Sequence, residues 1–91
     1  MAPGPTIADY LDGIRYRRYS RSVLLERRRL LALAAVCGDD EWFGTTPIDE
    51  VVATVTARLD LQSPTTLQRL EAAVEDYQAW RARYAAREAA A

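Results

Sequence analysis

Histidine and lysine are both absent from this 91-residue sequence, and cysteine occurs once, at Cys37. The lack of histidine excludes acid–base catalysis by an imidazole, and the lack of lysine removes a second base that activates serine or threonine nucleophiles. A single cysteine excludes an internal disulfide and, without histidine, leaves zinc without its usual ligands. We therefore expect a protein that is not an enzyme and that binds no metal, cofactor or small-molecule substrate.

Long apolar runs and glycine-rich loops are missing as well. The longest apolar stretch, residues 30–37, is far too short to span a membrane. The four glycines stand apart from one another, so no phosphate-binding loop is present. The first residues lack the charged and apolar regions of a secretory signal, and we expect an intracellular location.

Charge is the most informative property that is present. All twelve basic residues are arginine, and seven of them lie between Arg15 and Arg29. Residues 1–30 carry seven arginines and three acidic residues, which gives a net charge of +4. Residues 31–91 carry five arginines and ten acidic residues, which gives a net charge of −5. A basic segment on an acidic body is expected to contact nucleic acid, an acidic protein or a neighbouring copy, or else to pair with its own acidic helices. The predicted contact residues are Arg15, Arg17, Arg18, Arg21 and Arg28.

Helix-start signals occur at three places along the chain. Thr6 is followed three residues later by Asp9, and Thr46 and Ser63 each precede a proline. A threonine or serine oxygen can accept a hydrogen bond from a free N–H of the first turn, where proline is also tolerated. These signals predict helices that begin close to residues 6, 46 and 63.

Hydrophobic periodicity predicts an all-α fold, a single bundle of three or four helices with a long C-terminal helix. Residues 6–37 are expected to form either two helices or one bent helix. A loop or single turn follows, in which Trp42 and Phe43 close one end of the bundle. The expected organisation is a flexible tail over 1–5, helices over 6–18, 21–37, 48–59 and 64–87 in one domain, and a frayed tail over 88–91.

The last predicted helix is long enough to extend beyond the rest of a small domain. Its apolar residues follow a heptad-like spacing that ends in aromatic side chains. We predict that Tyr77, Trp80 and Tyr84 form a packing surface for another chain.

Two resemblances bear on function. Residues 48–70, with the stretch Ala57-Arg58-Leu59-Asp60-Leu61-Gln62-Ser63-Pro64-Thr65-Thr66-Leu67-Gln68-Arg69-Leu70, resemble helix-turn-helix DNA-binding domains. This resemblance implies that the second helix enters the major groove, with DNA contacts from Thr65, Thr66, Gln68 and Arg69. The turn glycine expected near Asp60 is absent, and acidic residues follow in the same helix.

The second resemblance is to small all-helical connector and adaptor proteins of the phage head–tail junction. It rests on residues 46–84, which read as a short helix, a capped turn and a long helix that contains Leu67-Gln68-Arg69-Leu70-Glu71-Ala72-Ala73-Val74-Glu75-Asp76-Tyr77. The resemblance implies a subunit assembled into a virion, with the basic segment of one copy against the acidic body of the next.

The sequence therefore favours a non-catalytic adaptor or assembly protein that self-associates or docks on a larger complex. A helix-turn-helix DNA-binding regulator is the first alternative. The second is a small inhibitor of a host enzyme that would act through Asp39, Asp40 and Glu41 or through the acidic residues of the last helix.

Overall fold

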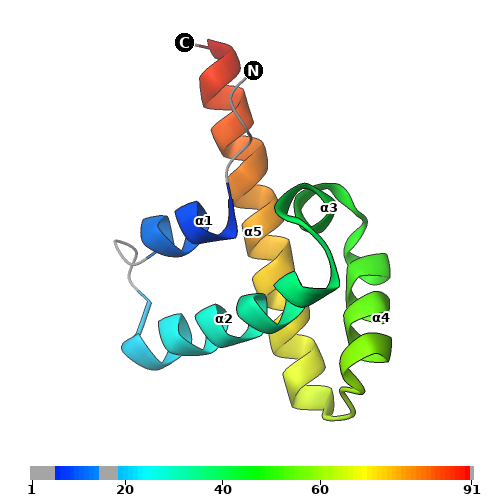
Figure 1. Ribbon diagram of the computed structural model, residues 1–91. Coiled ribbons are helices and arrows are strands. Elements are labelled where there is room, and N and C mark those ends of the chain that lie inside the picture. Colours follow the sequence, from blue (N-terminus) through cyan, green and yellow to red (C-terminus); the bar gives the residue numbers. More distant parts are fainter. Residues whose placement is uncertain (1–5, 15–18, 91) are drawn as a thin grey trace.

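The computed structural model describes residues 6–14 and 19–90, and every regular element in these two ranges is helical. The all-α class and the long C-terminal helix are confirmed. Helices α1 to α4 pack around α5, whose C-terminal end extends beyond them (Figure 1). The elements are α1 Ile7–Ile14, α2 Arg21–Ala34, a 3₁₀ turn Ala35–Cys37, α3 Asp40–Thr45, α4 Ile48–Leu59 and α5 Pro64–Ala90.

Two of the three predicted caps form. The Thr6 hydroxyl accepts from the N–H of Asp9 at 3.1 Å, and the Asp9 carboxylate accepts from the N–H of Thr6 at 3.0 Å. The Ser63 hydroxyl accepts from the N–H of Thr66 at 3.4 Å. The predicted cap by Thr46 is wrong. Helix α4 begins one residue later, after Pro47, whose carbonyl accepts from the N–H of Val51 at 3.0 Å.

The described residues contain one helix more than the expected three or four, because a short helix forms where a loop or single turn was expected, whereas the two-helix alternative for residues 6–37 is confirmed. Residues 6–37 form two separate helices, and the Ser20 hydroxyl caps the second by accepting from the N–H of Val23. The expected loop over 38–45 contains the short helix α3, capped by the Asp39 carboxylate on the N–H of Trp42 at 2.8 Å. At the other end, α5 continues to Ala90 rather than ending near residue 87.

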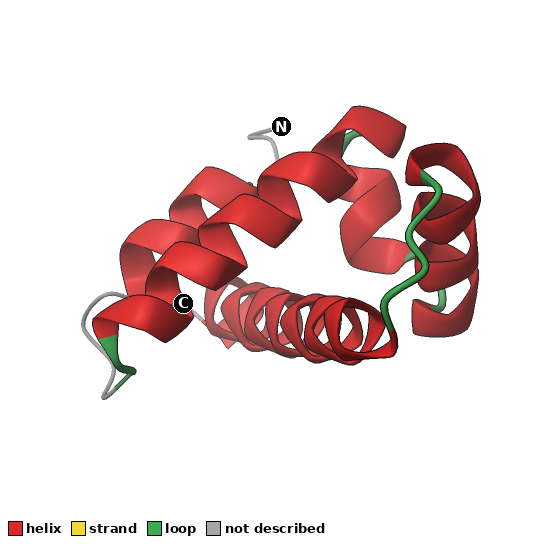
Figure 2. Cartoon of the chain, turned by 90° about the horizontal axis from the view of Figure 1, so that it is seen from below, coloured by secondary structure: helices red, strands yellow, loops and turns green. Residues whose placement is uncertain are grey.

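The core forms where α5 passes between α1 and α2 on one side and α4 on the other (Figure 2). Tyr77 lies at its centre and is completely buried. Its ring meets that of Tyr10 edge-on at 5.5 Å between centroids and that of Phe43 at 5.7 Å. Phe43 is completely buried and Trp42 packs beside it, as expected for aromatic side chains that close the bundle.

The connection between α4 and α5 turns at Asp60. This residue has φ 52° and ψ 45°, in the left-handed region that favours glycine, and its N–H donates to the carbonyl of Thr56. Asp60 therefore occupies the conformation of the glycine that a helix-turn-helix turn is expected to have.

Helix α5 also holds α3 in place. The amide of Gln78 donates to the carbonyls of Phe43 and Thr46 at 3.2 and 2.6 Å, and the Arg81 guanidinium donates to the carbonyl of Asp40 at 2.7 Å. The carbonyls of Phe43 and Thr46 lie at the C-terminal end of α3, where carbonyl groups have no partner within the helix, so Gln78 satisfies them.

We predict opposite effects for alanine at two glycines. A Cβ at Gly38 would lie 2.4 Å from Cε3 of the Trp42 ring, whereas a Cβ at Gly13 in α1 would make an ordinary contact, 3.5 Å from Nε1 of Trp80. Gly38→Ala should lower the free energy of unfolding by about 1–3 kcal/mol through overpacking. Gly13→Ala should raise it by about 0.5–1 kcal/mol. Urea unfolding measures both, and equal effects would contradict the packing around Trp42.

Candidate functional site

The position of α1 beside α2 is set by a polar cluster of Tyr10, Arg27 and Asp76. The Arg27 guanidinium donates to the Asp76 carboxylate at 2.7 Å and to the Tyr10 hydroxyl at 2.9 Å. The Tyr10 hydroxyl in turn donates to the same carboxylate oxygen of Asp76. These three residues belong to α1, α2 and α5, so the cluster joins three helices.

Burial makes this cluster stronger than a surface ion pair. The Arg27 and Asp76 side chains are only 16% and 22% exposed. The Arg27 guanidinium also lies 4.7 Å from the centroid of the Tyr19 ring, in cation–π contact. Burial, followed by the hydrogen bond to Asp76, raises the pKa of Tyr10 well above its usual range. Tyr10 therefore stays protonated and holds its hydrogen bond to Asp76.

A groove runs between α1 and α2 on the outer side of this cluster. It has a volume of about 190 Å³ and is lined by Leu11, Ile14, Arg21, Leu24, Leu25 and Arg28. Two arginines at such an apolar groove suit a ligand that is apolar on one side and negatively charged at its edges.

Arg21 and Arg28 are seven residues apart, so both lie on one face of α2, about 10 Å apart along the axis. Both are exposed, and neither has an acidic partner among the described residues. Arg21 and Arg28 are the two charged residues in the lining of the groove, and both are positive. The groove is therefore electropositive, and its two guanidinium groups are available to a partner.

Exposed apolar side chains concentrate in the same part of the molecule. Five large hydrophobic residues are exposed in the described ranges, and four of them lie between Val23 and Val36. Leu25, in the groove, is 56% exposed, and Val36 is 70% exposed. Three of the four belong to α2 and Val36 to the 3₁₀ turn that follows it, and such a concentration in one segment is typical of an interaction surface.

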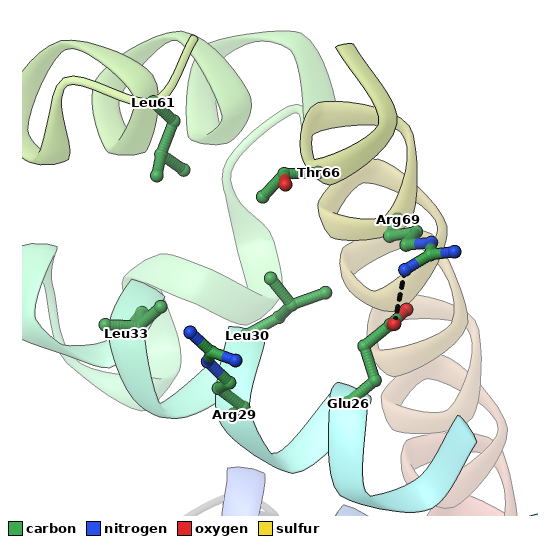
Figure 3. A pocket seen from close by; sticks show the side chains of 7 residues that line it. All are labelled: Glu26, Arg29, Leu30, Leu33, Leu61, Thr66 and Arg69. Atoms are coloured by element: carbon green, nitrogen blue, oxygen red, sulfur yellow. Dashed lines mark hydrogen bonds and ion pairs between the residues drawn. The ribbon is translucent and has the colours of Figure 1, made fainter. Parts of the chain in front are cut away.

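A second hollow lies on another side of α2, against the connection between α4 and α5. It has a volume of about 290 Å³. Figure 3 shows its lining residues arranged around it, with Arg69 donating to Glu26 at 2.7 Å on one side. They are Glu26, Arg29, Leu30, Leu33, Leu61, Thr66 and Arg69.

Two of the five predicted arginine contacts, Arg21 and Arg28, are described, and the structure brings both into the groove. The other three, Arg15, Arg17 and Arg18, lie outside the described residues. Arg27 was not among the predicted contacts, although its spacing from Leu31 and Ala34 places it in the middle of the apolar face of α2, away from Arg28 and Arg29. The sequence does not reveal its partner Asp76, 49 residues away.

The predicted aromatic surface is only partly available. Tyr77 is completely buried in this chain's own core, so the prediction that it packs against another chain is wrong. Trp80 is half-buried against Tyr10, at 5.6 Å between ring centroids. Tyr84 is 42% exposed on the extending part of α5.

The residues that the helix-turn-helix resemblance implicates lie in the first turns of α5. Thr65, Gln68 and Arg69 are exposed, and Thr66 is half-buried. Arg69 forms an ion pair with Glu26 of α2, a contact that any DNA phosphate would have to displace.

The acidic residues near α3 have structural roles. Asp39 caps α3, and the Asp40 carboxylate accepts from the N–H of Ile7 at 3.0 Å. No group of acidic residues or cysteine in the described ranges is arranged to hold a metal ion. Nor does any helix in these ranges combine the length and apolar character needed to cross a membrane.

Comparison with protein-family models, with curated proteins and with solved structures finds no match to this chain.

We predict that Tyr10 makes stability sensitive to alkaline pH. Above a pH of about 10, tyrosines of the unfolded chain ionise, whereas Tyr10 keeps its proton in the fold because its pKa is raised. The free energy of unfolding should then fall by about 1.4 kcal/mol per pH unit for each such tyrosine. The free energy of unfolding of Tyr10→Phe should fall less steeply with pH than that of the parent protein. Parallel slopes for Tyr10→Phe and the parent, from urea unfolding between pH 8 and about 11.5, would contradict the role of this cluster.

Proposed function

We propose that the protein is a non-catalytic helical adaptor that docks, through the groove between α1 and α2, on an acidic amphipathic helix of a partner protein. The observation that carries the proposal is a pair of exposed arginines, Arg21 and Arg28, that have no acidic partner within residues 6–14 and 19–90 and lie beside an apolar groove. Apolar anchors with charged residues at the edges are typical of helix-in-groove recognition.

The chemistry of the groove defines its partner. Leu11, Leu24 and Leu25 offer apolar surface to large aliphatic or aromatic side chains. The two guanidinium groups favour carboxylates at the edges of the partner helix, spaced about two turns apart. Charge complementarity of this kind speeds association and sets orientation, while the apolar contacts supply most of the affinity.

A different protein fits this groove better than a second copy of the chain. The exposed acidic parts of α4 and α5 present small side chains between their carboxylates, such as Ala53 and Ala57 beside Glu50, and Ala72 beside Glu75. Alanines do not fill a groove lined by leucine and isoleucine. Docking on a larger complex is therefore favoured over the contact between copies that the resemblance to phage connector proteins implies.

The apolar lining also favours a protein partner over nucleic acid. A phosphate backbone would use the arginines but would leave Leu25 in water. The arginine predicted to contact DNA from α5, Arg69, is already engaged by Glu26.

The proposal predicts binding of a synthetic acidic peptide, a 16-residue helix with leucine at i, i+3, i+4 and i+7 and glutamate at its edges. Fluorescence anisotropy should give a Kd on the order of 10 µM, weaker at high salt. Arg21→Gln combined with Arg28→Gln should weaken binding about three- to tenfold. Leu25→Asp should weaken it at least about tenfold, because a carboxylate would enter the apolar groove.

Matched variants control for total charge. Arg58→Gln combined with Arg83→Gln removes two exposed arginines outside the groove, and Val36→Asp places an acid on an exposed aliphatic position outside it. Both control variants should bind the acidic peptide with the affinity of the parent protein. Equal weakening by the control variants, or tighter binding to random duplex DNA than to the peptide, would contradict the proposal, and the second result would support the helix-turn-helix alternative.

A further inference from the structure

We infer that the hollow between α2 and the connection from α4 to α5 is a second binding pocket, which takes the C-terminal residue of a peptide chain that ends in an aliphatic side chain. The inference rests on the lining of this pocket and does not depend on the proposed adaptor function. Its floor is apolar, and its edge carries a guanidinium group that has no acidic partner in the part of the chain that the structure describes.

The pocket is distinct from the groove because the two use different sides of α2. The groove is lined by residues 21, 24, 25 and 28, and the pocket by residues 26, 29, 30 and 33. Each set follows the i, i+3, i+4, i+7 spacing of one helical face, and the two faces are rotated by well over 90° from each other.

The charges around the pocket define where an anion binds. Arg69 is held by Glu26 at 2.7 Å, so these two side chains neutralise each other on one side (Figure 3). Arg29 is exposed and has no acidic partner among the described residues. A ligand carboxylate is therefore attracted to Arg29 and repelled from Glu26.

The apolar floor lies close to that guanidinium along the helix. Arg29 is followed directly by Leu30, and Leu33 lies one turn further on, with Leu61 supplied by the connection to α5. The aliphatic group and the carboxylate of the ligand must therefore be close together. In the last residue of a peptide they are attached to the same Cα.

The volume of the pocket supports a ligand of this size. At about 290 Å³ it lies at the lower limit of pockets for drug-sized molecules. It has room for one leucine-sized side chain with its carboxylate. The hydroxyl of Thr66, also in the lining, is a further donor for the carboxylate.

The test is a titration of the ¹⁵N-labelled full chain with N-acetyl-L-leucine, followed by amide chemical shifts. We expect a Kd on the order of 1–10 mM, with shifts centred on Arg29, Leu33, Leu61 and Thr66. N-acetyl-L-leucinamide, which lacks the carboxylate, should bind about three- to tenfold more weakly.

Two variants and one control locate the contacts. Arg29→Gln should bind N-acetyl-L-leucine only as weakly as the parent protein binds N-acetyl-L-leucinamide. Leu61→Ala should bind N-acetyl-L-leucine about threefold more weakly than the parent protein does. Arg28→Gln, the neighbouring substitution in the groove, should leave binding unchanged. A well-dispersed spectrum confirms the fold of each variant.

Equal affinity for the acid and the amide would overturn the inference, as would unchanged binding by Arg29→Gln or shifts centred on Arg21 and Arg28. None of these results affects the proposed adaptor function, which the acidic helix tests at the groove.

Discussion

The ion pair between Arg27 and Asp76, with the Tyr10 hydroxyl bonded to both, is the interaction on which the rest of the structure depends. The partly buried Arg27 guanidinium exchanges its water for partners from two other helices. Removing either charged partner would leave the other charge poorly solvated and would destabilise the fold. Because it joins α1 and α2 to α5, it also keeps α1 and α2 at the spacing that forms the groove. Stability and the candidate binding site are thus coupled through the same three side chains.

Three consecutive arginines have three different surroundings because each residue of a helix is rotated by about 100° from the last. Arg27 points toward the core and pairs with Asp76, Arg28 lines the groove, and Arg29 lines the second pocket. Three adjacent arginines that look equivalent in the sequence therefore differ in the fold. One forms structural contacts, and the other two are accessible to ligands. This division gives a small domain two electropositive sites, both with apolar linings.

Local signals predicted the helices well, because caps and apolar spacing act within one or two turns. The caps at Thr6 and Ser63 and the stripe of α4 around Val51 and Val55 are of this kind. Helix α3 was not predicted because Gln78 and Arg81, more than 30 residues away, stabilise it. The arginine-rich character of the site was visible in the sequence, whereas its apolar lining depends on how α1 meets α2. The sequence also did not show that Tyr77 would be enclosed by Tyr10 and Phe43 of the same chain.

Neighbouring arginines of α2 have separate roles in the fold, and urea unfolding of Arg27→Gln and Arg28→Gln compares these roles. Both variants lose one positive charge from the same helix. Arg27→Gln should lower the free energy of unfolding by about 2–4 kcal/mol, because Asp76 is left with a poorly solvated charge. Arg28→Gln should change it by less than about 0.5 kcal/mol, since the Arg28 side chain is exposed and has no acidic partner in the described ranges. Equal effects of the two substitutions would contradict the separate roles of Arg27 and Arg28.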